Sequence, residues 1–292
     1  MHRDEVTVEE TLVRGLLAAQ FPEWADLPLE AVEPRGTDNW LYRLGADLVV
    51  RLPCRERTVA TLVRERTWLP RLAGRLRLEI PLPVAAGAPG AGYPWTWSVY
   101  PWLEGENAID APVVDLARAA GDLAALLEAL RHVDSDGGPV PGEESFFRGA
   151  PLGVFDRRVR ADLAHLRDEI DAEAATAVWD EALRAPGTER PVWVHGDLDR
   201  RNLLTRQGRL AAVVDFGSVG VGDQACDVAV AWKVLSPETR DIFRRALPVD
   251  EATWARARGW VVSQAVGALA YYTPETNPTL VVEARRWLAD AL

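Results

Sequence analysis

The sequence predicts an α+β protein of two unequal lobes with a cleft between them. The first third of the chain holds short runs of strand-forming residues separated by turn residues, whereas the remainder has mostly helical apolar spacing. The character changes near residues 101–106, so we expect a small β-rich lobe over residues 1–104 and a larger, mostly helical lobe over residues 105–292. A cleft between two lobes is a common place for a ligand site.

The β-rich third is expected to open with a helix. Residues 7–10 (TVEE) read as a capping box, and the helix that it begins ends before Pro22. Helical spacing of apolar residues predicts a second helix over residues 56–73. Strands are expected at residues 29–33, 40–44, 48–52, 82–86 and 93–100.

The larger lobe begins with a strong amphipathic pattern over residues 113–133. A loop rich in Gly and Pro follows at 134–153, and two short strands are expected at 192–194 and 210–214. The rest of this lobe reads as helix.

Composition narrows the class of protein. A formal net charge of −11 argues against nucleic acid as a partner and fits a cationic small molecule. Many soluble proteins, however, carry a net negative charge for solubility alone. The two cysteines, Cys54 and Cys226, have no metal-like spacing and indicate a reducing compartment. The first ten residues lack the apolar stretch of a signal peptide, and the longest apolar region, 260–272, is shorter than a membrane span. We therefore expect a cytoplasmic protein with no membrane and no evident protein partner.

The segment of residues 192–231 carries the chemistry. It reads as strand, polar loop, tight turn, strand and then Asp-Phe-Gly, and it contains Asp197, Asn202 and Asp215. Phosphoryl transfer needs a positioned magnesium ion and an oriented nucleophile, and Mg²⁺ prefers hard oxygen ligands. A loop with Asp197 and Asn202, followed by a hairpin that returns Asp215 to the same point, supplies two such ligands and a carboxylate to face an acceptor hydroxyl.

The pattern HGDxxxxN followed by DFG resembles the catalytic and metal loops of eukaryotic-like kinases. Its His-Gly-Asp form is similar to the aminoglycoside phosphotransferase family of antibiotic and small-molecule kinases. The resemblance implies a protein-kinase-like fold, Asp197 as catalytic base, Asn202 and Asp215 as Mg²⁺ ligands, and ATP or GTP as phosphoryl donor. It also implies that His195 is structural, bonded to the metal loop, and that Asp227 holds the catalytic loop through backbone amides.

The resemblance extends, less specifically, to the first third of the chain. Thr37, Asp38 and Asn39 would form the hairpin turn over the phosphates, or an ordinary turn. Where kinases place a lysine on the strand 48–52, this chain has Arg51, which binds phosphate well through its planar fork. The expected partner of Arg51 is Glu65. The alternative interpretation of Glu65 is a solvated charge on the face of a helix.

The connector between the lobes is expected to bind the purine. The carbonyl of Pro101 would accept and the N–H of Leu103 would donate, and Pro101 keeps its carbonyl although it lacks an N–H.

The function that follows is Mg²⁺-dependent phosphotransfer to an alcohol group of a small molecule. An aminoglycoside or another cationic antibiotic is favoured as acceptor, which would be antibiotic resistance by O-phosphorylation. Macrolides, peptide antibiotics, choline-like amines and sugars stay open, as does a pseudokinase without turnover. Carboxylates expected to face a cationic acceptor are Asp134, Asp136, Glu143, Glu144, Asp241 and Glu275.

A protein kinase is disfavoured, because the 12 residues from Asp215 to Asp227 (227 − 215) leave little room for an activation segment. One compositional feature stands apart from these motifs. Of the 33 basic residues, Lys233 is the single lysine.

Overall fold

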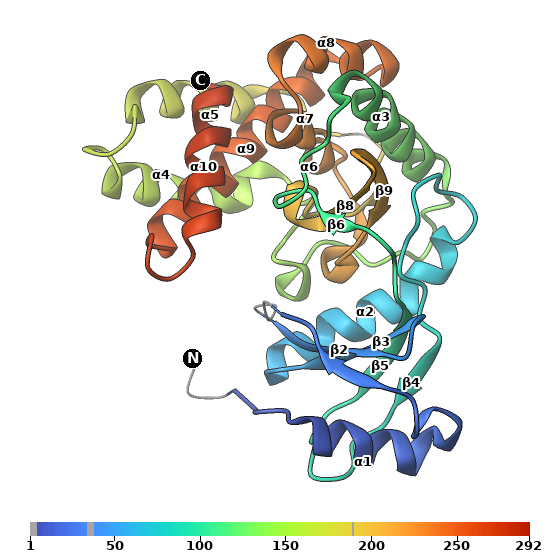
Figure 1. Cartoon of the computed structure of the whole chain (residues 1–292). Helices are drawn as coiled ribbons and strands as arrows, with labels where there is room; N and C mark the ends of the chain where they lie inside the picture. The colour runs from blue at the N-terminus through green and yellow to red at the C-terminus, as the bar shows by residue number, and fades with distance from the viewer. Residues whose placement is uncertain (1–4, 34–37, 189) are drawn as a thin grey trace.

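The first lobe is built on a five-stranded antiparallel sheet with the order β1-β2-β3-β5-β4. The structure is a computed structural model that describes residues 5–33, 38–188 and 190–292. The strands are β1 (Leu29–Ala31), β2 (Asn39–Leu44), β3 (Leu48–Pro53), β4 (Ala85–Gly87) and β5 (Trp97–Pro101). Two helices accompany them: α1 (Glu10–Gln20), on the face away from the second lobe, and α2 (Glu56–Leu72), between the sheet and that lobe (Figure 1).

The predicted start of the first helix is wrong. Helix α1 begins at Glu10 with Glu9 at the N-cap, and no side chain caps it. Thr7 lies in irregular chain before the cap, held in place because the neighbouring Val6 N–H donates to Cys54 O (2.9 Å) and the Val8 carbonyl accepts from the Tyr42 hydroxyl (2.9 Å). Contacts with the sheet therefore override the local capping signal.

The second lobe is mostly helical, as expected, with small sheets at the face toward the first lobe (Figure 1). Its helices are α3 (Leu116–His132), α4 (Asp156–His165), α5 (Ala172–Arg184), α6 (Ala225–Val228), α7 (Val230–Val234), α8 (Pro237–Ala246), α9 (Glu251–Tyr271) and α10 (Pro278–Ala291). Its strands are β6 (Glu106–Asn107), β7 (Val192–Val194), β8 (Leu203–Arg206), β9 (Arg209–Val213) and β10 (Gly220–Gly222). Short 3₁₀ turns of the two lobes are η1 (Pro22–Trp24), η2 (Glu143–Ser145), η3 (Leu152–Phe155), η4 (Arg200–Asn202) and η5 (Phe216–Ser218).

Two separate hydrophobic cores hold the lobes. The smaller core lies between α1 and the five-stranded sheet. The larger core fills the helical lobe and also takes in Leu69 and Leu72 from the end of α2 and Leu78 beyond it. Backbone hydrogen bonds of Glu79 with Ala211 (3.0 Å) and Val213 (2.9 Å) attach this stretch to β9. Residues 69–79 thus join the helical lobe in space, and the division at residue 104 stays a proposal.

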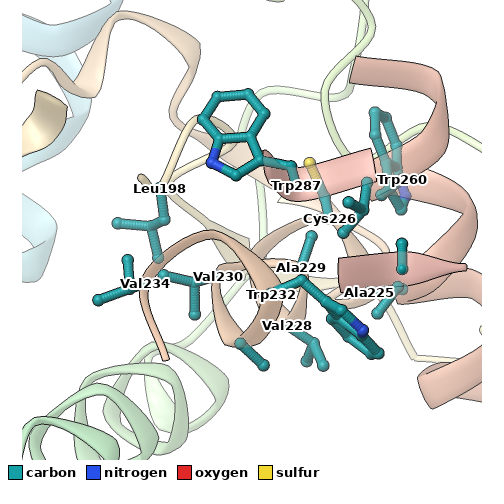
Figure 2. Close-up of a cluster of buried hydrophobic side chains, with 14 of the residues drawn as sticks. Leu198, Ala225, Cys226, Val228, Ala229, Val230, Trp232, Val234, Trp260 and Trp287 are labelled. Carbon is teal, nitrogen blue, oxygen red and sulfur yellow. The ribbon is translucent and has the colours of Figure 1, made fainter. Parts of the chain in front are cut away.

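The middle of the larger core lies directly beneath the polar loop that follows β7. Helices α6 and α7 are buried there, and Figure 2 shows their apolar side chains with Leu198 of the loop and Trp287 of α10 in one cluster. The loop therefore packs against buried helices. Among the described residues, no helix combines the length and the apolar character that a membrane crossing requires.

Candidate functional site

The loop between β7 and β8 is fixed from below by a buried carboxylate. Asp227 of α6 accepts hydrogen bonds from the backbone N–H groups of His195 (2.6 Å) and Gly196 (2.8 Å). Gly196 has a φ of +88°, and a Cβ there would lie 2.9 Å from the Cβ of Arg148, so the bend requires glycine. Burial raises the pKa of Asp227, and the hydrogen bonds from these two backbone N–H groups oppose this shift.

His195 links this loop to the loop that carries Asp215. Its Nδ1 accepts from the backbone N–H of Asp197 (3.2 Å), so Nε2 carries the hydrogen and donates to the carbonyl of Val214 (3.0 Å). The ring also packs edge-on against Phe216 with centroids 4.4 Å apart. These contacts give His195 the architectural position expected of it.

Asp197 lies at the centre of the site and is surrounded by cations. Its Oδ1 is 3.3 Å from Arg148, and its Oδ2 is 4.0 Å from Arg201 and 3.4 Å from the amide nitrogen of Asn202. Burial alone would raise the pKa of Asp197, but the positive charges of Arg148, Arg201 and Lys233 lower it well below its usual range. Asp197 is therefore ionised at neutral pH, as a group must be that accepts a proton from a hydroxyl.

Asn202 and Asp215 meet beside Asp197. Asn202 donates its amide N–H to the carbonyl of Asp197 (2.8 Å), which leaves its amide oxygen for a cation. The backbone N–H of Val214 donates to the carbonyl of Asn202 (3.0 Å), so the β8–β9 hairpin returns Asp215 to the loop as the sequence predicted. Asp215 adopts a left-handed conformation (φ 62°), which is rare for a non-glycine residue and typical of functional sites.

These two residues fit a magnesium ion. An amide oxygen and a carboxylate are hard ligands of the type that Mg²⁺ uses together with phosphate oxygens and water. Within the described residues, no group of three or more His, Cys, Asp or Glu side chains forms a metal site. A cation held by Asn202 and Asp215 would thus need further oxygens from a phosphate ligand.

Arg51 reaches this point from the sheet of the other lobe. Its guanidinium binds Glu65 of α2 (2.7 Å) and Asp215 (3.1 Å). With the side-chain amide of Asn39 turned so that its oxygen faces Arg51, that oxygen accepts two hydrogen bonds from the guanidinium (3.1 and 3.2 Å). Glu65 is 0% exposed, and burial raises its pKa to about 7 although Arg51 opposes the shift. The predicted pairing of Arg51 with Glu65 is present, and it connects the sheet directly to Asp215.

The hairpin turn before β2 is only partly described. Thr37 lies outside the described residues, and Asp38 pairs with Arg55 (2.6 Å) while its carbonyl accepts from Cys54 N (3.0 Å). The side chain of Asp38 therefore closes the base of the turn, and Asn39 faces Arg51.

The connector runs from Pro101, at the end of β5, to Leu103 and Gly105. The backbone N–H of Trp102 donates to the carbonyl of Asp47 (2.7 Å), which holds the connector against the β2–β3 turn. Gly105 has a φ of +143°, and a Cβ there would lie 2.9 Å from the carbonyl oxygen of Thr205. The connector is thus tightly held on both sides, and its contact with a purine stays a prediction.

Sequence reasoning missed Arg148 and Arg201. Arg201 lies directly before Asn202, so the motif itself could have indicated it, and its guanidinium holds Asp199 (2.5 Å) as well as facing Asp197. Arg148 comes from the Gly/Pro loop 134–153, where no sequence signal predicts its approach to Asp197.

The acidic side chains expected around a cationic acceptor are dispersed. Glu144 pairs with Arg64 (3.3 Å), and Asp134 accepts from the backbone N–H of Asp136 (3.0 Å). Asp241 lies on α8, at the end of the helical lobe away from the sheet (Figure 1), so it is no longer a candidate. Glu143 lines a groove of about 340 Å³.

A sequence profile described as the phosphotransferase enzyme family matches residues 32–260. Two aminoglycoside 3'-phosphotransferases, from Escherichia coli and Salmonella typhimurium, are 27% and 29% identical to this chain over 142 residues. That match covers 48% of this chain and 48% of each relative, so it spans about half the length of the curated relatives.

Solved structures match over nearly the whole chain. The GDP complex of wild-type aminoglycoside 2'-phosphotransferase-IIIa has a TM-score of 0.71 at 17% identity, covering 97% of this chain and 98% of that one. The apoenzyme of a macrolide 2'-phosphotransferase from Brachybacterium faecium has a TM-score of 0.61 at 22% identity, covering 92% and 98%. At these identities the matches show the fold alone, and the expected protein-kinase-like fold is confirmed.

Proposed function

The chain belongs to the phosphotransferase enzyme family, and we propose that it transfers the γ-phosphoryl group of ATP or GTP to a hydroxyl of a small molecule. The observation that carries the proposal is the meeting of Asp197, Asn202 and Asp215 from one lobe with Arg51 from the other. A cytoplasmic site of action accords with a nucleoside triphosphate as donor.

Each residue has a part in the proposed reaction. Asn202 and Asp215 would hold Mg²⁺, which when bound neutralises charge on the triphosphate oxygens. Arg51, fixed by Glu65, would direct its fork at phosphate oxygens. Asp197 would orient the acceptor hydroxyl and take its proton as the bond to phosphorus forms.

The joint retention of the three polar residues speaks against a pseudokinase without turnover. In this chain Asp197, Asn202 and Asp215 are all retained, and the cation of β3 is an arginine that reaches Asp215. The arginine therefore preserves the link between the sheet and the metal loop that this function requires.

For the acceptor we propose a hydroxyl-bearing antibiotic, with an aminoglycoside or another cationic compound favoured. The net charge of −11 would raise the local concentration of a cation, and Glu143 offers a carboxylate in the groove of the helical lobe. Relatives named as aminoglycoside phosphotransferases support this choice.

An uncharged acceptor such as a macrolide is the second candidate, supported by the character of that same groove. Phe146, which is 55% exposed, lies in it, and Arg158 rather than a second carboxylate accompanies Glu143. The lining residues are Glu143, Phe146, Phe147, Val154, Phe155 and Arg158.

A panel of acceptors tests the function. Aminoglycosides, macrolides, peptide antibiotics, choline-like amines and sugars are each incubated with ATP or GTP and Mg²⁺, and nucleoside diphosphate release is measured together with the mass of the product. We expect one class to stimulate release and to gain a single phosphoryl group. If no acceptor does so with either nucleotide, the proposed function is wrong.

A salt series then decides between the two acceptor classes. The kcat/KM of a cationic acceptor should fall as ionic strength rises, because screening weakens long-range attraction to an acidic protein. A best acceptor that is uncharged would favour the second candidate, and a cationic one indifferent to salt would refute the electrostatic argument for the first.

A further inference from the structure

Lys233 is a buried cation that the proposed reaction does not use. It is the single lysine among 33 basic residues, it lies in α7, and it is 1% exposed. Its ammonium donates to the carbonyl of Leu198 (3.3 Å) and lies 5.0 Å from the ring centroid of Trp287. Removing a charge from water is costly, so a buried lysine implies a specific use for its charge.

The charges around Lys233 belong to the site. The groups that face it are Asp199 and Asp197 of the catalytic loop, Arg148 of the preceding loop and Cys226 of α6. Burial lowers the pKa of Lys233, the two carboxylates raise it, and Arg148 lowers it further. The ammonium thus lies on the inner side of the loop that carries Asp197.

The contacts of the ammonium favour lysine over arginine. The described contacts of the ammonium are one carbonyl and one aromatic face, which suit a compact charge on a flexible stem. A guanidinium is larger and presents five N–H donors in a rigid fork, a geometry that one carbonyl and one aromatic face do not match.

Lys233 and Asp227 act on the same loop with opposite charges. Asp227 lies on the buried helix α6 and Lys233 on the buried helix α7. Asp227 accepts from the N–H groups of His195 and Gly196. Lys233 donates to the carbonyl of Leu198, the residue after Asp197. On one side of Asp197 a carboxylate therefore holds two backbone N–H groups, and on the other side an ammonium holds a backbone carbonyl.

We propose that Lys233 is a positioning residue for phosphoryl transfer: its ammonium fixes the Leu198 carbonyl and so sets the place of the Asp197 side chain. The proposal rests on the proposed function, because it concerns the same reaction. Lys233 touches neither the nucleotide site at Arg51 nor the groove lined by Phe146, so it acts on the orientation of Asp197 and not on ligand binding.

The kinetic test compares Lys233→Met and Lys233→Arg with Arg167→Met, which removes an exposed cation from the same lobe. Lys233→Met keeps the length of the side chain and loses the charge. We expect its kcat to fall about 10-fold or more while KM for nucleotide and acceptor changes less than about threefold, since positioning acts on the transition state. Lys233→Arg should not restore kcat, and Arg167→Met should match the wild type.

Hydrogen exchange of the full-length protein gives a second readout that does not need turnover. Backbone amides of residues 195–202 should exchange at least about 10-fold faster in Lys233→Met, while those of α9 stay as in the wild type, because the loop loses one of its two anchors. Arg167→Met should leave both segments unchanged.

The outcomes separate the two proposals. A folded Lys233→Met protein with wild-type kcat and wild-type exchange of residues 195–202 would overturn the positioning role. Equal loss of protection over α9 would also overturn it, since that pattern means general destabilisation. If the wild type itself shows no transfer to any acceptor, the proposed function fails, and hydrogen exchange alone decides whether Lys233 holds the loop.

Discussion

Replacing Asp227 by asparagine should both destabilise the protein and loosen the loop of residues 195–202. The Asp227 carboxylate is 1% exposed and accepts two short hydrogen bonds, from His195 N (2.6 Å) and Gly196 N (2.8 Å). The amide introduced by Asp227→Asn could accept only one of them, and its NH₂ group would face the other N–H, which is also a donor.

The magnitude follows from that single mismatch. A buried N–H left without a partner costs about 1–3 kcal/mol, and hydrogen bonds to a charged acceptor contribute about 1.5–3 kcal/mol each. The neutral amide recovers part of this loss, because burial disfavours the charge of Asp227 and raises its pKa. We therefore expect the free energy of unfolding to fall by about 2–4 kcal/mol, a large share of the roughly 5–15 kcal/mol of a typical domain.

Urea unfolding at pH 7, followed by far-ultraviolet circular dichroism, measures this change. The matched control is Asp168→Asn, whose side chain is 87% exposed and which should stay within about 0.5 kcal/mol of the wild type. An Asp227→Asn protein as stable as that control, with an unchanged m value, would refute the role of Asp227 as the anchor of the loop.

The remaining predictions concern the residues that join the two lobes. Arg51→Ala should raise KM for nucleotide and lower kcat in steady-state assays. Arg51→Lys should recover part of both, because lysine keeps the charge but cannot bind Glu65 and Asp215 at once. Unchanged kinetics of Arg51→Ala would show that Arg51 does not bind the phosphates. Asp215→Ala should lose Mg²⁺-dependent nucleotide affinity in calorimetric titrations, and an affinity that is equal with Mg²⁺ and with EDTA in the wild type would contradict its role. Burial raises the pKa of Glu65 to about 7 in the folded protein, above its ordinary 4.5, so the folded state holds a proton there that the unfolded chain has released. The contribution of Glu65 to the free energy of unfolding should therefore fall as pH rises from 4.5 to 7. Denaturant unfolding at pH 5, 6 and 7 measures how steeply the free energy of unfolding falls with pH, and this fall should be smaller in Glu65→Gln than in the wild type. An equal fall in both proteins would show that Glu65 stays ionised throughout.

The sequence was sufficient where a residue's place depends on local pattern. Most strands and helices follow from apolar spacing, although the short strands β6, β8 and β10 of the second lobe were not predicted. The HGDxxxxN and DFG motifs predict that Asp197, Asn202 and Asp215 meet, because the intervening hairpin is short. The pairing of Arg51 with Glu65 was predicted from the resemblance to kinases, which place a cation on the corresponding strand, and the structure contains it.

The sequence was insufficient where the backbone takes an uncommon path. Arg148 reaches Asp197 because Phe146, Phe147 and Gly149 all adopt positive φ (52°, 54° and 81°), a conformation that aromatic residues rarely take and that no sequence rule predicts. The surroundings of Asp197 are consequently rich in arginine, whereas the sequence suggested an acidic pocket for a cation.

Long-range packing accounts for the other differences. Leu69, Leu72 and Leu78 lie in the core of the helical lobe although they precede the connector, because the chain after α2 pairs with β9 through Glu79. Such contacts join segments that are far apart in the chain, which local periodicity does not report.

Transfer of the terminal phosphoryl group in a single turnover tests the central claim most directly. Enzyme in excess over γ-³²P-labelled ATP or GTP is mixed with Mg²⁺ and the best acceptor of the panel, and labelled product is followed in the wild type and in Asp197→Asn. We expect the label to appear on the acceptor in the wild type and the rate to fall about 10²–10⁴-fold in Asp197→Asn while nucleotide binding survives, because the amide cannot take the proton. Transfer at near wild-type rate by Asp197→Asn would show that Asp197 is not the base.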